Sequence, residues 1–192
     1  MKKVNFFRTI CYGVLSFLCV ACQENYTPKP MGYMRIALPK KEYRTFDSLP
    51  YPFTFEYPVY AHFTPVNGIQ WSDINIDGLN AKIYLSYVKN PNLDSCIAQT
   101  LSFITPHMAK ASGIREKEIN DSNHKKYGYV YDIKGKEVAS TYQFYLTDSN
   151  KHFIRGALYL NCRPNNDSLA PIIDFLKKDL DKMLESWVWK SW

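Results

Sequence analysis

The first 22 residues constrain this chain most, because they decide which residues remain to fold and in which compartment. A basic head precedes an apolar run over residues 10–20, and Ala21 and Cys22 follow at once. This is the order of a bacterial lipoprotein signal, with a small residue at the cleavage site and a thiol that receives diacylglycerol. We therefore expect residues 1–21 to be removed as a lipoprotein signal peptide and Cys22 to carry lipid. The basic residues of the head are Lys2, Lys3 and Arg8.

Two other interpretations of this segment compete with lipidation. A transmembrane anchor is disfavoured, because the apolar run is well short of the roughly 20 residues that span a bilayer as a helix. A plain secretory signal, cut beside Ala21 without lipid, is the better alternative, since Cys19 stands where leucine is more usual. With either kind of cleavage, the remaining chain lies outside the cytoplasm.

The chain that remains is large enough for one core. Cleavage takes 21 of the 192 residues and leaves 171; it also removes three basic residues, which lowers the formal net charge from +6 to +3. No dense run of Lys and Arg remains, so nucleic acid is not an expected partner. Pro28 and Pro30 favour an extended tether over residues 22–30. We expect residues 31–192 to form a single domain.

After cleavage only two cysteines besides Cys22 remain, namely Cys96 and Cys162. Outside the cytoplasm a disulfide between them is permitted. The alternative is two buried thiols that act as small apolar side chains. Spacing alone does not decide between the two, because it does not give the distance between the residues.

Alternation of apolar and polar residues predicts a sheet. Residues 81–88 show the clearest pattern, with Ile83 and Leu85 on one side and Lys82 and Tyr84 on the other. Prolines bound residues 53–57, which suits an edge strand or a brief extended segment. Polar turns separate the last three strands and predict an antiparallel meander. The predicted strands are residues 33–38, 53–57, 60–64 (as a continuation of 53–57), 81–88, 127–133, 138–146 and 152–160.

A mid-chain helix is predicted over residues 93–108, where apolar side chains repeat every three or four positions. Asn92 can cap its start, and Gly113 can mark its end. Pro106 interrupts the pattern, so we expect a kink or break near Thr105.

A long C-terminal helix is predicted from Ser168, a suitable cap, with Pro171 in its first turn. Its apolar stripe runs to Trp187. The order of elements predicts an α+β fold, in which an antiparallel sheet carries the mid-chain helix and the long C-terminal helix.

The strongest metal-like motif covers residues 73–78, which copy the first half of a calcium loop. The second half fails, because the twelfth position is Tyr84 where a bidentate Glu is needed. A short strand that runs into a Gly turn is the alternative. No histidine has the spacing of a zinc ligand. We expect no metal and no cofactor.

No segment has the pattern of an enzyme active site. Nucleophile elbows, phosphate-binding loops and paired catalytic carboxylates are all missing from the sequence. A hydrolase built on Cys96 or Cys162 with a distant histidine is the least favoured hypothesis. The aromatic tail over residues 187–192 could bind sugar or a membrane interface. The alternative, which we favour, is that Trp187 ends the helix stripe while Trp189 or Trp192 packs on the sheet.

Several stretches together resemble one family. They are Tyr-Thr-Pro-Lys-Pro-Met-Gly-Tyr-Met-Arg-Ile (26–36), Pro-Phe-Thr-Phe-Glu-Tyr-Pro (52–58), Ala-Lys-Ile-Tyr-Leu-Ser-Tyr (81–87), Gln-Phe-Tyr-Leu-Thr-Asp-Ser (143–149) and Lys-His-Phe-Ile-Arg-Gly-Ala-Leu-Tyr-Leu (151–160). With the signal, this chain is similar to the gliding motility lipoprotein GldD family of Bacteroidetes. As a weaker fold analogy, it is also similar to Mog1/PsbP-like domains.

The resemblance implies a cell-envelope lipoprotein linked to surface gliding and the type IX secretion apparatus. It carries over one functional residue, Cys22 as the lipid-bearing cysteine, and no catalytic residues. We therefore expect a non-enzymatic accessory protein, anchored on the outer membrane or on the periplasmic face of a membrane. Its partners would be the lipid membrane and other envelope proteins. The alternative is a periplasmic or surface glycan-binding module that uses exposed aromatic side chains such as Trp189 or Trp192.

Overall fold

The computed structural model describes residues 36–190, which belong to one compact unit. The predicted signal peptide, the tether, Cys22 and Trp192 lie outside the described residues, so the predictions made for them stay predictions. Within the described part, no helix is long and apolar enough to cross a membrane.

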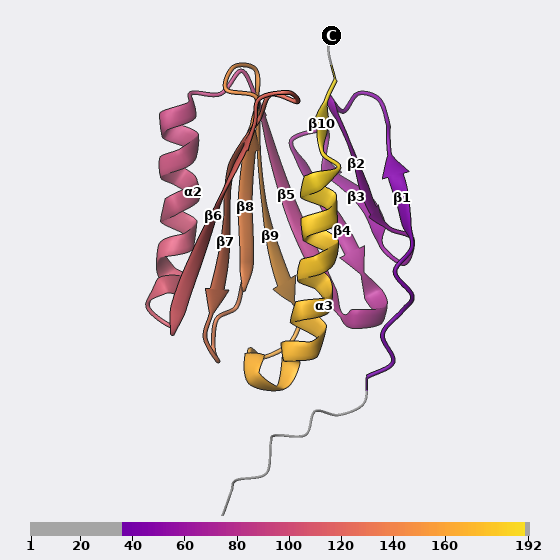
Figure 1. Ribbon diagram of the computed structural model, residues 1–192, viewed down its shortest axis with the longest axis vertical. Helices are drawn as coiled ribbons and strands as arrows, with labels where there is room; N and C mark the ends of the chain where they lie inside the picture. Colours follow the sequence, from indigo (N-terminus) through magenta and orange to yellow (C-terminus); the bar gives the residue numbers. More distant parts are fainter. Residues whose placement is uncertain (1–35, 191–192) are drawn as a thin grey trace, which may run out of the picture. The chain divides into compact units, whose positions relative to one another are not determined.

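Seven antiparallel strands form the large sheet, in the order β3-β4-β5-β9-β8-β7-β6 (Figure 1). A smaller sheet has the order β1-β2-β10. The strands of the large sheet are β3 (His62–Asn67), β4 (Trp71–Ile76), β5 (Ala81–Lys89), β6 (Gly113–Asp121), β7 (Lys126–Lys134), β8 (Tyr142–Thr147) and β9 (His152–Leu160). The small sheet comprises β1 (Tyr43–Phe46), β2 (Phe53–Pro58) and β10 (Val188–Trp189). The helices are η1 (Asp77–Leu79), α2 (Leu93–Met108) and α3 (Asn166–Glu185).

One face of the large sheet is buried against α3 and the small sheet. Ile83 and Leu85 point to this face because alternate side chains of a strand share a side. Leu176 and Leu180 of α3 lie in the same apolar cluster. Trp187, fully buried just after α3, closes the cluster. Its rings stack on Phe55, with centroids 4.8 Å apart and planes 3° from parallel.

The other face of the large sheet is covered by α2 over only part of its width. Ile104 of α2 is buried in a second apolar cluster with Tyr131, Tyr145 and Phe153, which come from β7, β8 and β9. Figure 1 shows α2 and α3 on either side of strands β6–β9. Side chains of β4 and β5 on the α2 side stay accessible, and Tyr84 is 47% exposed.

The predicted fold class is confirmed, and most strands lie where the sequence placed them. The strands predicted over residues 53–57, 81–88 and 152–160 correspond to β2, β5 and β9. β7 and β8 pair antiparallel, although β8 begins at Tyr142 instead of residue 138. The connection is longer than a tight hairpin because Gly135 turns the chain with φ +154 and its carbonyl accepts from Val138 N.

Three strand predictions need correction, and three strands, β1, β6 and β10, were not predicted. The described part of the strand predicted over residues 33–38 is not a strand; without a pairing partner, residues 36–38 precede β1, which begins at Tyr43. Residues 60–64 do not continue β2, because the chain turns where Ala61 N donates to Pro58 O and starts β3 in the other sheet. β2 is the middle strand of its sheet and not an edge. β6 was missed, because this edge strand exposes most of its side chains and lacks apolar alternation.

The helix boundaries also differ from those predicted. α2 continues past Thr105 to Met108. Pro106 removes the N–H that would bond to the Ser102 carbonyl, but only two residues of the helix follow it, so the interruption is confined to the last turn. The Asn92 cap is confirmed, since its Oδ1 accepts from Ser95 N at 3.1 Å. Gly113 opens β6 and does not end the helix. α3 begins at Asn166 rather than after Ser168, which puts Pro171 beyond the first turn.

Candidate functional site

A groove of about 1120 Å³ lies between α2 and the uncovered part of the large sheet. Its floor is formed by β4, β5, β8 and β9, and one wall is formed by α2. The groove is lined by residues that include Trp71, Asp73, Asn75, Lys82, Tyr84, Ser86, Phe103, His107, Gln143, Arg155, Ala157 and Tyr159.

The strand register explains why these residues share one surface. Tyr84 of β5 lies opposite Asp73 of β4 on one side and Ala157 of β9 on the other. Ala157 in turn lies opposite Gln143 of β8. Directly opposed residues of antiparallel strands point to the same face. The row from Asp73 to Gln143 therefore crosses the floor of the groove.

The neighbouring row runs parallel to the first. Trp71 lies opposite Ser86, Ser86 opposite Arg155, and Arg155 opposite Tyr145. The small side chain of Ser86 leaves a depression between Trp71, which is 55% exposed, and Arg155. Tyr145 already belongs to the core beneath α2. The groove thus ends where α2 begins to cover the sheet.

The α2 wall contributes aromatic surface to the groove. The Arg155 guanidinium lies 3.9 Å from the ring centroid of Phe103. The His107 ring meets the Tyr159 ring at 6.3 Å. Burial, with a smaller effect of nearby Lys110, lowers the pKa of His107. At neutral pH His107 therefore adds a neutral ring to this wall.

Two hydrogen-bond donors of the floor have no acceptor. Gln143 is only 5% exposed, and its Nε2 makes no hydrogen bond. The guanidinium of Arg155 forms no ion pair with a carboxylate among residues 36–190; it lies against the Phe103 ring and interacts electrostatically with Tyr159 and Cys96. Burial lowers the pKa of Arg155 from its ordinary value, but not enough to remove the charge near neutral pH. Neither group has an acceptor among the described residues, and Gln143 Nε2 itself is buried.

At the β4 side of the groove, an acidic and a basic side chain form an ion pair. Lys82 Nζ donates to Asp73 Oδ2 at 3.0 Å, so these two charges neutralise each other. Residues 73–76 belong to β4 and run into the turn of η1, which confirms the strand alternative to a calcium loop. Among the described residues, no group of three or more His, Cys, Asp or Glu side chains could hold a metal ion.

The cysteines do not form the permitted disulfide. Cys96 and Cys162 are both free thiols. Cys96 lies in the first turns of α2, near Phe153 at the start of β9, whereas Cys162 follows the other end of β9. Burial raises the pKa of the Cys96 thiol, partly opposed by Arg155. A raised pKa disfavours the thiolate that a nucleophile needs.

The described part of the aromatic tail packs against the protein. Trp189 pairs with Phe53 in the small sheet, and its ring stacks on His152 at 5.3 Å. With Trp187 buried, the packing interpretation of these two residues is confirmed. The exposed aromatic rings that can meet a ligand are instead Trp71, Tyr84 and Phe103.

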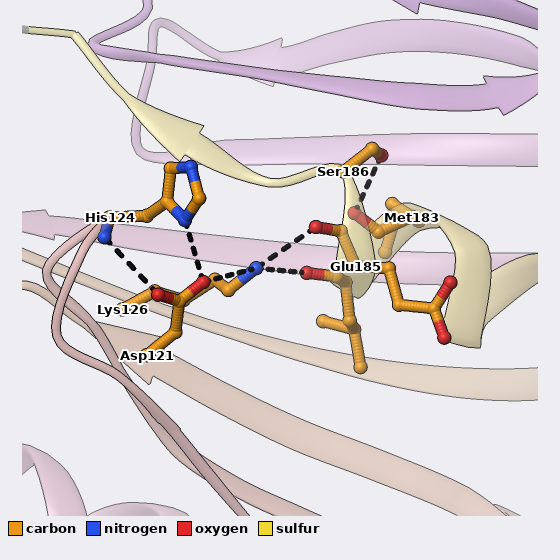
Figure 2. Close-up of polar contacts among 7 residues, drawn as sticks. Asp121, His124, Lys126, Met183, Glu185 and Ser186 are labelled. Carbon is orange, nitrogen blue, oxygen red and sulfur yellow. Dashed lines mark hydrogen bonds and ion pairs between the residues drawn. The ribbon is translucent and has the colours of Figure 1, made fainter.

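Other polar clusters hold the fold together and lie outside the groove. Figure 2 shows Lys126, whose Nζ donates to the carbonyls of Leu184 and Glu185 at 3.0 Å each, at the C-terminal end of α3. Asp121 Oδ2 lies 3.8 Å from the same Nζ and accepts from His124. These contacts connect β7 to α3.

The groove residues were not singled out from the sequence. A signal was present, because Gln143 and Arg155 are polar residues within otherwise apolar strands. Tyr84, Gln143 and Arg155 also lie within three of the stretches that carry the family resemblance. Their proximity could not be read from the sequence, since it depends on β5 pairing with β9, about seventy residues further along the chain.

Two solved structures resemble this fold. The cyanobacterial PsbP of Synechocystis sp. PCC 6803 is 10% identical, with 81% of this chain and 97% of that chain covered at a TM-score of 0.49. The Ran-binding protein Mog1p of Saccharomyces cerevisiae is 11% identical, with 77% and 95% covered at a TM-score of 0.48. PsbP and Mog1 are the two proteins named in the fold analogy drawn from the sequence. Likenesses of this strength carry no functional argument. No curated protein matches the chain.

The family comparison covers nearly the whole chain. The sequence profile of the gliding motility lipoprotein GldD family matches residues 23–189, from the position after Cys22 to the last strand. The match spans every strand and helix described above, including all strands of the groove. The chain belongs to the gliding motility lipoprotein GldD family.

Proposed function

We propose that this chain is a lipid-anchored accessory protein of the cell envelope that serves gliding motility by binding, without catalysing a reaction. The observation that carries the proposal is the family match over residues 23–189. The basic head, the apolar run and Ala21-Cys22 before it support an anchor at Cys22. The partners would be proteins of a gliding machinery linked to type IX secretion.

The chemistry of the groove supports binding rather than catalysis. Its deepest polar groups, Gln143 and Arg155, donate hydrogen bonds but do not act as general bases near neutral pH. The exposed rings of Trp71 and Tyr84 offer contact area of the kind that recognition surfaces use. Neither free thiol lines the groove: Cys96 lies within α2 and Cys162 beyond the end of β9. We therefore propose the groove as the functional surface of the folded part.

The anchor is tested by metabolic labelling with palmitate in the host, followed by membrane fractionation. Wild type should incorporate label and sediment with membranes. Cys22→Ala should lose the label and leave the membrane fraction. Cys162→Ala is the matched control, because it removes an exposed cysteine of the folded part and should keep both label and location.

The role in motility is tested by deleting the gene and measuring colony spreading and the protein released by the type IX apparatus. We expect both to fall, and we expect affinity capture of the wild type to recover envelope proteins. Unchanged spreading and secretion, together with no captured envelope protein, would contradict the proposal. Palmitate incorporation that persists in Cys22→Ala would contradict the assigned anchor.

A further inference from the structure

Gln143 and Arg155 both line the groove, and neither forms a hydrogen bond or ion pair through its side chain with another described residue. Gln143 lies opposite Ala157, two residues from Arg155 on the same face of β9. Diagonal neighbours of this kind have Cβ atoms about 7–8 Å apart, close enough for both side chains to reach one small group. Both are held on strands, so their positions are set before any ligand arrives.

An unpaired buried donor calls for an explanation. Buried polar atoms nearly always have a hydrogen-bond partner, because leaving one unpaired is costly. Gln143 Nε2 is such an exception in a strand where every residue is buried. A leucine of similar volume would avoid the cost. Gln143 lines the groove, and a ligand acceptor that reached this nitrogen would satisfy it.

The two donors define the chemistry of the acceptor. A guanidinium presents planar, charged N–H groups that match a carboxylate. The ring of Phe103 at 3.9 Å fixes the guanidinium plane and shields it from water on one side. The Gln143 amide adds a neutral donor beside it. A carboxylate would therefore pair with both groups at once.

Aromatic rings continue the groove away from this end. Tyr84 packs edge-on against Tyr159, with centroids 5.5 Å apart, which fixes its orientation. Trp71 lies on the next strand, β4, in the same cross-strand row as Arg155, and is more than half exposed. Rigid rings of this kind contact the apolar faces of sugar rings, while neighbouring planar polar groups hydrogen-bond the hydroxyls. Asp73, Lys82 and Asn75 line the same floor.

We propose that the groove binds a carboxylate-bearing sugar of an acidic glycan. Arg155 and Gln143 hold the carboxylate, and sugar rings lie along Tyr84 and Trp71. This inference goes beyond the proposed function and does not depend on a protein partner. It retains the glycan alternative drawn from the sequence but moves it from Trp189, which is packed, to a different set of residues.

A peptide fits the groove less well than a glycan. The floor is the face of a sheet, where backbone N–H and C=O groups of β4, β5 and β9 pair with neighbouring strands. An extended peptide adds to an open strand edge, and such an edge is absent from this floor. A helical peptide needs an apolar groove, but this floor carries Asp73, Lys82 and Arg155. Side-chain recognition of rings and hydroxyls suits a sugar.

Calorimetric titration of the full chain in detergent tests the proposal. Two carboxylated sugars serve as probes for two sources: the disaccharide of N-acetylglucosamine and N-acetylmuramic acid for the wall, and tetragalacturonate for surface polysaccharide. Each is compared with its carboxyl methyl ester. A short peptide with a free C-terminal carboxylate is the third probe. We expect at least one acid sugar to bind and its ester to bind about tenfold more weakly, as for a lost charge-assisted hydrogen bond.

Variants assign the binding to the groove. Gln143→Leu and Arg155→Leu should each weaken binding of the acid sugar by about tenfold but leave the ester nearly unchanged. Trp71→Ala should weaken acid and ester alike, by roughly fivefold. Arg163→Leu is the control for lost positive charge, because Arg163 is exposed and outside the groove. Thermal unfolding of Gln143→Leu should occur at or above the wild-type temperature, which separates lost binding from lost folding.

Three results would overturn the proposal. One is no binding of either acid sugar. Another is binding that Gln143→Leu and Arg155→Leu leave at the wild-type strength. The third is a peptide that binds more tightly than both sugars, which would make the groove a peptide site. None of these changes the palmitate or motility results, so the proposed function stands or falls separately.

Discussion

At the scale of single residues, Gly156 fixes the contact between β9 and its neighbours. A Cβ at this position would lie 2.3 Å from two ring carbons of Phe144 and 3.1 Å from Leu85 Cδ2. Phe144 is fully buried, so its ring has no free space into which it could move. We predict that Gly156→Ala lowers the free energy of unfolding by about 1–3 kcal/mol.

Urea unfolding measures this effect. Gly113→Ala is the matched control, because a Cβ there meets no atom within 4 Å. Its free energy of unfolding should stay within about 0.5 kcal/mol of wild type. Equal values for the two variants would show that Phe144 does not restrain this position.

His152 makes stability depend on pH. Burial lowers its pKa, and its Nδ1 lies 2.7 Å from Tyr87 Oη while its ring stacks on Trp189. In the unfolded chain a histidine binds a proton near pH 6.5, whereas folded His152 resists protonation until lower pH. The contribution of His152 to stability is therefore fully present above about pH 6.5. It is lost as the pH falls from there toward the folded pKa of His152, by up to about 1.4 kcal/mol per pH unit.

Urea unfolding at several pH values between 7 and 5 tests this prediction, with His152→Phe as the comparison. The variant keeps a ring against Trp189 but cannot bind a proton, so its stability should fall less steeply with pH. A residual slope is expected from His107, whose pKa is also lowered. Identical slopes for the variant and wild type would contradict the assignment to His152.

At the scale of elements, Asp179 connects α3 to the segments before β3. Its carboxylate is buried and accepts from the Tyr43 hydroxyl at 2.8 Å, from the Tyr60 hydroxyl and from Lys41 Nζ. Burial and the bond to Asp179 raise the pKa of both tyrosines. We predict that Asp179→Ala costs roughly 3 kcal/mol of stability, because two tyrosine hydroxyls lose their acceptor and Lys41 loses its ion pair, keeping only its bond to the Phe175 carbonyl.

Chemical unfolding of Asp179→Ala beside Asp174→Ala isolates this effect. Asp174 lies on the same helix but is exposed, so its replacement should change stability by no more than about 0.5 kcal/mol. The two substitutions change helix propensity and charge equally. A similar loss in both would mean that the buried contacts of Asp179 contribute little.

The C-terminal end of α3 depends on a second buried charge. Lys126 is 5% exposed and donates to the carbonyls of Leu184 and Glu185, which have no partner within the helix (Figure 2). We predict that Lys126→Met lowers the free energy of unfolding by roughly 2 kcal/mol, since the Glu185 carbonyl loses its donor and the Leu184 carbonyl keeps only the backbone N–H groups of Ser186 and Trp187.

Hydrogen exchange at α3 and urea unfolding both report on this contact. Exchange should quicken most in the last turn of α3. Lys117→Met, on the exposed side of β6, is the control and should change neither measurement. Unchanged exchange at the end of α3 in Lys126→Met would contradict a capping role.

Local sequence patterns predicted the elements in which apolar residues recur at regular intervals. β5 and β9 alternate cleanly, and α3 carries an apolar stripe, so their positions followed from the sequence. β6 escaped prediction because an edge strand with charged side chains on both faces has no alternation. Pro106 does not break the helix near Thr105, because only two residues of α2 follow it and its effect is confined to the last turn.

At the scale of the whole molecule, the groove could not be predicted from sequence patterns. The groove exists because α2 covers only one part of the sheet and because β5 pairs with β9. This pairing places Tyr84 opposite Ala157, which in turn lies opposite Gln143. No local spacing encodes that pairing. The family and the predicted anchor could be read from linear motifs, whereas the surface that would do the binding could not.

We have proposed the groove as the functional surface of this family member. The most direct test is the spreading of host colonies whose chromosomal copy carries Gln143→Leu, with membrane-bound protein quantified in the same cells. The substitution removes a donor that the fold does not use, so abundance should match wild type. We predict that the spreading of Gln143→Leu colonies falls toward the rate of the deletion strain. Wild-type spreading, with the variant present at the normal level, would contradict it.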